Sequence, residues 1–187
     1  MVSLSDIGWV GSHFFIYGCL MRGATYILYE GKVMTPNAGK MWQMCQDYKC
    51  KVAMMGPAHM RILKKLDYHG EQIKKHDLSC LKCLILGGER ADPETVRWTH
   101  KNIPHVLIND TWGQTETGTV TFANMANTEE FGPVLPTLLG SVTRPFPGWD
   151  FRVFSEENEE CTPGELGKLV IKLPLPPAFM LTLWGDD

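Results

Sequence analysis

The chain has 187 residues, of which 44% are apolar and 21% charged, and its formal net charge is −3. These values exclude an intrinsically disordered chain, which would combine few apolar residues with a large net charge. The slight acidity argues against nucleic acid as a partner, because proteins that bind nucleic acid present a basic face. No run of about 20 apolar residues occurs, so no membrane-spanning helix is predicted.

The cysteines favour an intracellular protein. The first 30 residues lack the pattern of a secretory signal peptide, so we expect reduced thiols and a location in the cytosol or the mitochondrial matrix. Cys80 and Cys83 form a C-x-x-C that could bind zinc, but no second well-spaced pair accompanies them. The apolar run that follows favours a buried strand instead.

Strand-like and helix-like segments alternate along the first two thirds of the chain. β-Branched, aromatic and apolar runs predict strands over residues 25–29, 52–55, 81–86 and 106–108. Apolar residues at helical spacing predict one helix that begins at Pro36 and another that begins at Pro57. Asp92 is a good N-cap ahead of Pro93 and predicts a third helix to about Lys101. This alternation predicts an α/β fold, with a mainly parallel sheet flanked by helices.

The pattern changes near residue 135. Alternating residues at 151–154 and 168–171 predict antiparallel strands, and the acidic segment 156–160 predicts a turn between them. We therefore expect two subdomains, an α/β part over residues 1–135 and a β-rich partial barrel over residues 136–187. An incomplete barrel exposes strand edges, which favours self-association of the chain.

A polar loop that contains glycines follows the last strand predicted for the parallel sheet. It spans residues 109–118 and reads N-D-T-W-G-Q-T-E-T-G. Because it lies at the carboxyl end of a parallel strand, it stands where open α/β folds bind ligands. Trp112 can stack on a base, Thr115 can donate to a phosphate oxygen, and Glu116 can hold Mg²⁺. A polar loop with capping threonines would explain the same residues taken alone.

The segment W-G-Q-T-E-T-G at 112–118 resembles the [YW]-x-Q-T-E-T-G signature of the adenylate-forming enzymes. This superfamily comprises acyl-CoA synthetases, luciferases and the adenylation domains of peptide synthetases. Other segments resemble those of acetyl- and propionyl-CoA synthetases, in the same order along the chain. They are D-I-G-W at 6–9, Y-E-G at 29–31, G-P-A at 56–58 with Arg61, G-E at 88–89 and G-E-L-G at 164–167. The chain is thereby identified as similar to the central part of the large N-terminal domain of such a synthetase.

This resemblance implies ATP, Mg²⁺ and coenzyme A as cofactors, and a carboxylic acid as substrate. The acid would react with ATP to an acyl-adenylate and pyrophosphate, and then with CoA to a thioester. The residues that would contact the nucleotide are Gly88, Glu89, Arg90, Asp110, Thr111, Trp112, Gln114 and Thr115. Thr115 and Glu116 would be the catalytic residues, Thr115 at the α-phosphate and Glu116 at Mg²⁺. Because the acid is already an anion, the reaction needs alignment and charge neutralisation more than a base.

Two departures from the acetyl-CoA synthetase pattern concern the acyl pocket. The family has a second tryptophan where this chain has Gly113, and usually a valine where it has Gly87. Met54 and Met55 occupy two further pocket positions, and methionine is a flexible lining for an apolar chain. We therefore expect a pocket for propionate or a longer, short- or medium-chain acid. The aromatic residues Phe14, Phe15 and Tyr17 are expected in the core or in the wall of this pocket.

Several parts of the family's active site are not found in the sequence. The resemblance places the phosphate loop before Met1, and the ribose-binding aspartate and the lysine-bearing C-terminal domain after Asp187. The chain alone is therefore expected to be inactive, and the remainder of the synthetase is its expected partner.

Two other functions are compatible with the same residues. One is a non-catalytic interaction or regulatory module that retains the fold. The other is an adenylating enzyme for a different acid, such as an aryl acid or an amino acid. Amino-acid activators generally carry an early aspartate for the substrate amine, and none is identified in this sequence.

Overall fold

The computed structural model describes residues 1–187 except 33, 125–135, 178, 183 and 186–187. A parallel sheet of four strands lies at the centre of its first half, in the order β1-β2-β3-β4. The strands are β1 (Val2–Ser3), β2 (Val52–Met55), β3 (Cys83–Leu86) and β4 (Leu107–Asp110). The mainly parallel sheet predicted from the sequence is confirmed.

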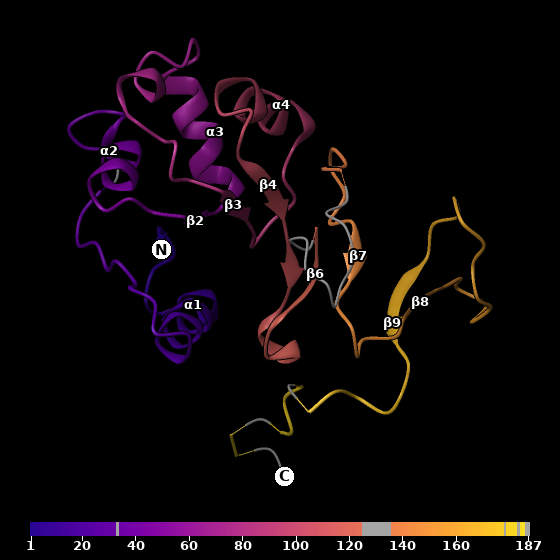
Figure 1. Cartoon of the computed structure of the whole chain (residues 1–187). Helices are drawn as coiled ribbons and strands as arrows, with labels where there is room; N and C mark the ends of the chain where they lie inside the picture. Colours follow the sequence, from indigo (N-terminus) through magenta and orange to yellow (C-terminus); the bar gives the residue numbers. More distant parts are fainter. Residues whose placement is uncertain (33, 125–135, 178, 183, 186–187) are drawn as a thin grey trace.

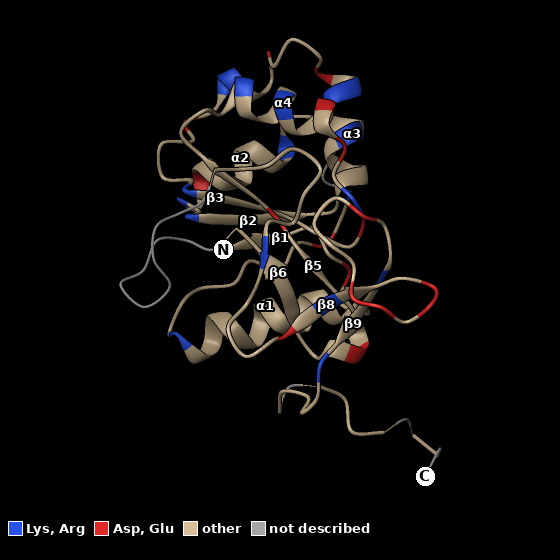
Figure 2. Ribbon diagram, turned by 90° about the vertical axis from the view of Figure 1, so that its right-hand side faces the viewer, with Lys and Arg blue, Asp and Glu red and all other residues tan. Residues whose placement is uncertain are grey.

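The described residues form four α-helices, on both faces of this sheet (Figure 1). They are α1 (Val10–Met21), α2 (Lys40–Asp47), α3 (Pro57–Leu66) and α4 (Pro93–Asn102), with a short 3₁₀ helix η1 (Ile73–Lys75). Helices α2, α3 and α4 cover one face, and α1 lies on the other (Figures 1 and 2). Within the described part of the chain, no helix has the length and apolar character that crossing a membrane requires.

The hydrophobic core lies between the sheet and helices α2 to α4. Ala53 and Met55 of β2 and Leu84 and Leu86 of β3 are buried in it. Successive side chains of a strand point to opposite faces, so Met54, between two core residues, points toward α1 instead. One strand therefore supplies both the core and the surface on the α1 side.

The strands described from Trp112 onward are antiparallel. β5 (Trp112–Gly113), β6 (Val120–Ala123) and β7 (Arg144–Pro145) form one sheet, and β8 (Phe151–Phe154) and β9 (Lys168–Ile171) form a hairpin. The strands at 151–154 and 168–171 are thus confirmed. Among the residues described, these strands close no barrel. The predicted boundary near residue 135 falls within 125–135, outside the described residues, and stays a prediction.

Two segments before β2 differ from the sequence-based prediction. Residues 25–29 form no strand, since only Ile27 makes an isolated parallel bridge, to Val2. Helix α2 begins at Lys40 rather than at Pro36. The side chain of Asn37 accepts a hydrogen bond from the backbone N–H of Gly39 at 2.7 Å, a local turn that competes with the helix and delays its start.

Candidate functional site

A cleft of about 450 Å³ opens where strands β2, β3 and β4 end, and we call it the carboxyl-edge cleft. Residues within 4–15, 54–59, 87–89 and 111–114 line it together with Val120. Each of these segments follows a strand or belongs to α1 or β6, so the cleft is assembled from parts of the chain that are far apart in sequence. This is the edge at which parallel α/β sheets bind ligands.

Three of the four residues predicted for an acyl pocket line this cleft, namely Met54, Gly87 and Gly113. Met55 does not, because it points to the other face of β2 and is completely buried in the core. The methionine pair is thus divided by the alternation of the strand. The sequence match to two adjacent pocket positions could not distinguish the two faces.

Helix α1 supplies the apolar wall of the cleft. Val10, Phe14 and Phe15 line it, and Phe14 and Phe15 are half-buried. Tyr17 was expected with them in the core or in the pocket wall, but it is 62% exposed and does not line the cleft. Two of the three aromatic residues therefore lie where the sequence places them.

Gly87 and Gly113 of the cleft are positions where neighbouring groups approach the backbone closely. A Cβ at Gly113 would lie 2.7 Å from the carbonyl oxygen of Thr119 and 2.9 Å from Cα of Val120, in or beside β6. A Cβ at Gly87 would lie 2.6 Å from the hydroxyl of Thr111. Each glycine is therefore required by its neighbours, and neither is simply a pocket wall with its side chain removed.

His59 lines the cleft and was not singled out from the sequence. It lies in the first turn of α3, and its Nδ1 is buried with no hydrogen-bond partner among the described residues. Its place directly after G-P-A, at the start of a helix at the carboxyl edge, is the signal that could have identified it.

Glu89 joins the cleft to the start of α3. Its carboxylate accepts hydrogen bonds from the backbone N–H of Ala58 at 2.7 Å and from the guanidinium of Arg61 at 2.8 Å. The hydrogen bond from Arg61, aided by Ala58, holds the pKa of Glu89 below its usual range. The carboxylate thus stays charged and satisfies a free N–H at the helix N-terminus. The G-E segment therefore has a structural role at α3 whether or not a nucleotide is bound.

Strand β4 ends at Asp110, and Thr111 follows it beside the end of β3. Thr111 donates its hydroxyl to the carbonyl of Leu86 at 2.8 Å, which ties the end of β4 to that of β3. Asp110 is only 4% exposed, and its Oδ1 has no hydrogen-bond partner among the described residues. Burial raises the pKa of Asp110 to about 6, although backbone N–H groups and Arg90 oppose this shift. A buried, unpaired acceptor of this kind is costly and marks a candidate binding position.

Trp112 packs in an aromatic cluster and does not line the cleft. Its ring meets Phe122 edge-on at a centroid distance of 5.7 Å and Phe151 at 6.1 Å. Trp149 stacks on Phe151 at 5.7 Å and so extends the cluster. The cluster joins β5 and β6 to the β8–β9 hairpin and holds the start of the signature segment in place.

The rest of the signature forms a short 3₁₀ turn, η2 (Thr115–Thr117). The backbone N–H of Gln114 donates to the hydroxyl of Thr117 at 3.1 Å, and Gly118 closes the turn in the left-handed region at φ 66°. Thr115 and Glu116 are exposed, and the carbonyl of Glu116 accepts the N–H of Met180 at 3.0 Å. The turn thus presents one hydroxyl and one carboxylate to solvent, next to Gln114 in the cleft.

The predicted nucleotide residues therefore fall into two groups. Gly88, Glu89, Thr111 and Gln114 line the carboxyl-edge cleft, and the other four, Arg90, Asp110, Trp112 and Thr115, flank it. No group of three or more His, Cys, Asp or Glu side chains in the described residues could hold a metal ion by itself. A lone carboxylate such as Glu116 suits Mg²⁺ that is held mainly by substrate phosphates and water.

Comparison with known proteins identifies the relatives of this chain. It is 39% identical over 187 residues to the acetyl-coenzyme A synthetase of Burkholderia thailandensis. The alignment covers 97% of this chain and 27% of that protein. It is 36% identical over 185 residues to the propionate–CoA ligase of Escherichia coli K12. That alignment covers 98% of this chain and 28% of the ligase. The chain thus spans under a third of the length of these relatives.

Solved structures share the fold at lower sequence identity. The acetoacetyl-CoA synthetase of Streptomyces lividans aligns with a TM-score of 0.81 and 22% identity, over 96% of this chain and 26% of that one. The luciferase-like enzyme of Zophobas morio aligns with a TM-score of 0.81 and 17% identity, over 100% of this chain and 42% of that one. At these identities the likeness concerns the fold alone.

The sequence profile described as AMP-binding enzyme matches residues 1–181, nearly the whole chain. The relationship to acetyl- and propionyl-CoA synthetases predicted from the signature is thereby confirmed. The chain belongs to the family of AMP-binding enzymes.

Proposed function

We propose that this chain contributes part of the active site of an ATP-dependent acyl-CoA synthetase, an AMP-forming acid–CoA ligase. The observation that carries this proposal is the carboxyl-edge cleft, in which signature residues meet an apolar wall. Thr111, Gly113 and Gln114 line it beside Phe14 and Phe15 of α1. A polar end for a nucleotide and an apolar end for an acyl group are what an acyl-adenylate requires.

The reaction has two steps. An oxygen of the substrate carboxylate attacks the α-phosphorus of ATP, the bond to the bridging oxygen breaks, and pyrophosphate leaves. The CoA sulfur then attacks the acyl carbon, and AMP leaves as the thioester forms. Both steps depend on alignment, which a cleft built from several fixed strand ends supplies.

The residues around the cleft would divide this work. Glu89 and Thr111 would lie along the adenosine, and Asp110 would accept a hydrogen bond from an amino group of the base. Thr115 would donate to the α-phosphate, while Glu116 would hold Mg²⁺, which neutralises phosphate charge when it is bound. Trp112, held by its aromatic neighbours, would present the stacking surface.

We infer a substrate of propionate length or longer. The cleft of about 450 Å³ has Phe14, Phe15 and Met54 in its wall. The remainder of the synthetase, with its phosphate loop, ribose-binding aspartate and C-terminal lysine, would be needed for turnover, so the chain alone is expected to be inactive. Its six cysteines are all free, which agrees with an intracellular location.

The test is substrate preference in the full-length protein. We expect kcat/KM to exceed that for acetate about fourfold for propionate and at least tenfold for butyrate or hexanoate, because a larger apolar pocket gains about 0.8 kcal/mol for each methylene buried. A Glu116→Gln variant is the control and is expected to lose turnover with every acid. A clear preference for acetate would contradict the inferred chain length, and turnover unaffected by Glu116→Gln would contradict the proposed site.

A further inference from the structure

A second cleft, of about 530 Å³, is lined by the last turn of α3, by residues 68–74 and by α4 from its first turn to its last. We call it the basic cleft, since Lys64, Lys74, Arg97 and Lys101 line it together with Glu71 and Glu94. Both helices begin at the carboxyl edge of the sheet, so their last turns lie at the opposite edge. The basic cleft shares no lining residue with the carboxyl-edge cleft, which the first turn of α3 lines, so the two are separate.

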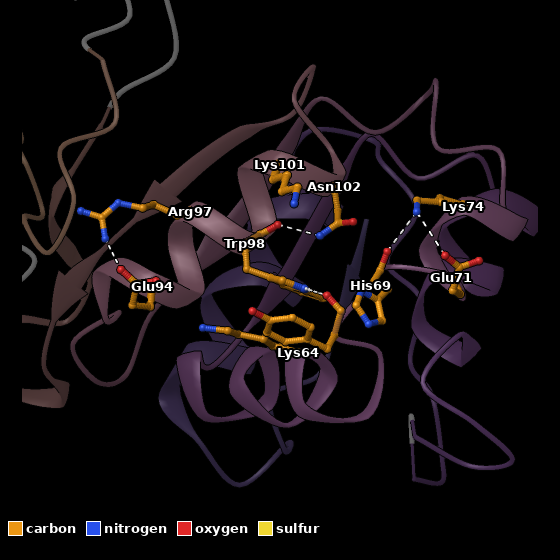
Figure 3. A pocket seen from close by; sticks show the side chains of 10 residues that line it. Lys64, His69, Glu71, Lys74, Glu94, Arg97, Trp98, Lys101 and Asn102 are labelled. Atoms are coloured by element: carbon orange, nitrogen blue, oxygen red, sulfur yellow. Dashed lines mark hydrogen bonds and ion pairs between the residues drawn. The ribbon is translucent and has the colours of Figure 1, made fainter.

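Half of the positive side chains in the basic cleft are already paired. Lys74 lies 3.3 Å from the carboxylate of Glu71 and donates to the carbonyl of His69 at 3.0 Å, and Arg97 pairs with Glu94 (Figure 3). Lys64 and Lys101 form no ion pair or hydrogen bond with the residues the structure describes. In the view of Figure 3 they lie on either side of Trp98. The cleft thus presents two ammonium groups without an ion-pair partner among the described residues, and of the two Lys64 also interacts at longer range with the carboxylate of Asp92.

The helix ends account for only part of this charge. Lys64 and Lys101 occupy the last turns of α3 and α4, where a cation interacts favourably with the helix dipole. Each helix C-terminus is equivalent to about half a negative charge, so two of them offset roughly one of the two lysines. A positive charge remains, on a chain whose net charge is −3. Figure 2 shows basic residues on both helices.

The floor of the basic cleft is rigidly built. The buried indole of Trp98 donates its N–H to the carbonyl of Tyr68 at 2.8 Å, and the amide of Asn102 donates to the carbonyl of Trp98 at 2.8 Å. Gly70 has φ +69°, and a Cβ there would lie 1.9 Å from the side-chain oxygen of Asn102. The loop can approach α4 this closely only because residue 70 is glycine. The shape of the cleft is therefore defined by the fold and does not depend on mobile side chains alone.

We propose that the basic cleft is a second ligand site, which binds a small molecule carrying phosphate groups through Lys64 and Lys101. Its volume lies in the range of small-molecule sites, and lysine is a common phosphate ligand. Two ammonium groups around one aromatic floor match a ligand with at least two neighbouring negative charges. This inference does not depend on the acyl-CoA synthetase activity, since the two clefts share no lining residue.

The test is a titration of the ¹⁵N-labelled 187-residue chain with sodium pyrophosphate, without magnesium, followed by NMR. The indole N–H of Trp98 and the amides of residues 64–74 and 97–102 are expected to shift. In Lys64→Glu/Lys101→Glu the dissociation constant should rise at least tenfold. The matched control Lys65→Glu/Lys75→Glu carries the same net charge on residues outside the cleft and should bind as the original chain does. Raising the salt concentration should weaken binding.

Three results would overturn the proposal. One is the absence of shifts around Trp98, another is an equal loss of binding in both double variants, and the third is a response confined to residues 113–117. The last would show pyrophosphate bound at the signature turn only. Should the glutamate pair disturb the spectrum outside the cleft, Lys64→Gln/Lys101→Gln replaces it, with the same tenfold weakening expected.

Discussion

An Asp110→Asn variant is expected to be more stable than the original chain by roughly 2 kcal/mol at pH 7.5, and at the same time a poorer nucleotide binder. Burial raises the pKa of Asp110 from 3.8 to about 6. Each unit of such a shift corresponds to about 1.4 kcal/mol, and the charged carboxylate is the form that the folded state disfavours. Asparagine has the same size and carries no charge, so it removes this penalty.

The sign and the pH window follow from the two pKa values. A carboxyl group whose pKa is raised on folding contributes its stability fully below about pH 4, and loses it as the pH rises through about 6. Urea unfolding of both proteins at several pH values should therefore give equal stability near pH 4, and a growing advantage of the variant up to about pH 7. The exposed Asp47, changed to asparagine, is the control. Parallel curves for Asp110→Asn and the original chain would contradict the burial penalty.

The loss of binding tests the role of the unpaired oxygen. If Oδ1 of Asp110 accepts a hydrogen bond from the amino group of a bound base, the asparagine variant loses a charged acceptor. Affinity for AMP, measured by calorimetry, should then fall at least tenfold, since hydrogen bonds to charged groups contribute about 1.5–3 kcal/mol. Unchanged affinity would remove Asp110 from the nucleotide site.

Gly113→Ala is expected to destabilise the chain by roughly 2 kcal/mol, an effect typical of overpacking. The added Cβ would lie 2.7 Å from the carbonyl oxygen of Thr119, a backbone atom that cannot move without separating β5 from β6. The irregular register between Trp112 and Gly113 brings the two strands this close. The urea midpoint should therefore drop.

Gly18→Ala is the matched control for this variant. Gly18 lies in α1, and a Cβ there meets nothing within 4 Å. Alanine at this position should raise stability by about 0.5–1 kcal/mol, because it restricts the unfolded chain and favours the helix. A Gly113→Ala protein as stable as the original chain would show that the carbonyl oxygen of Thr119 lies farther from this Cβ position than 2.7 Å.

The parts of the fold that were predicted correctly have a strong local pattern. Strands β2 and β4 are short apolar runs, and α3 and α4 each begin with proline at the first helical position. The side chain of Asp92 accepts a hydrogen bond from the N–H of Thr95 at 2.9 Å, as an N-cap should. In these elements local propensity and tertiary packing agree.

Helix α1 was not predicted because its sequence gives no clear helical signal. Its residues V-G-S-H-F-F-I-Y-G-C-L-M are apolar on most sides, with two glycines and no capping side chain. The small residues Ser12 and Cys19 are its buried positions, while Tyr17 and Leu20 are exposed. The buried side of α1 is therefore not marked by large apolar residues, and hydrophobic periodicity could not reveal the helix. The strand predicted at residues 25–29 was wrong for the opposite reason. The segment has the composition of a strand, but only Ile27 pairs with another residue, in an isolated bridge.

The candidate site was predictable as a set of motifs but not in its geometry. The order of motifs placed Gly87, Thr111 and Gln114 near one another, and the structure brings them to one cleft. Motif matches could not show that Met55 points into the core, or that Glu89 contacts the start of α3. Both depend on which face of a strand, or which neighbouring helix, a residue meets, and these are properties of the assembled sheet.

The most direct test of the proposed site is the binding of a stable acyl-adenylate analogue, an alkyl ester of AMP, to the ¹⁵N-labelled chain. NMR shifts are expected at the amides of residues 87–89 and 111–116, at the indole N–H of Trp112, and at Phe14 and Phe15 of α1. A butyl ester is also expected to bind more tightly than a methyl ester, since the apolar wall is then filled. Shifts confined to other parts of the chain, or none at saturating ligand, would contradict the assignment of the carboxyl-edge cleft as an acyl-adenylate site.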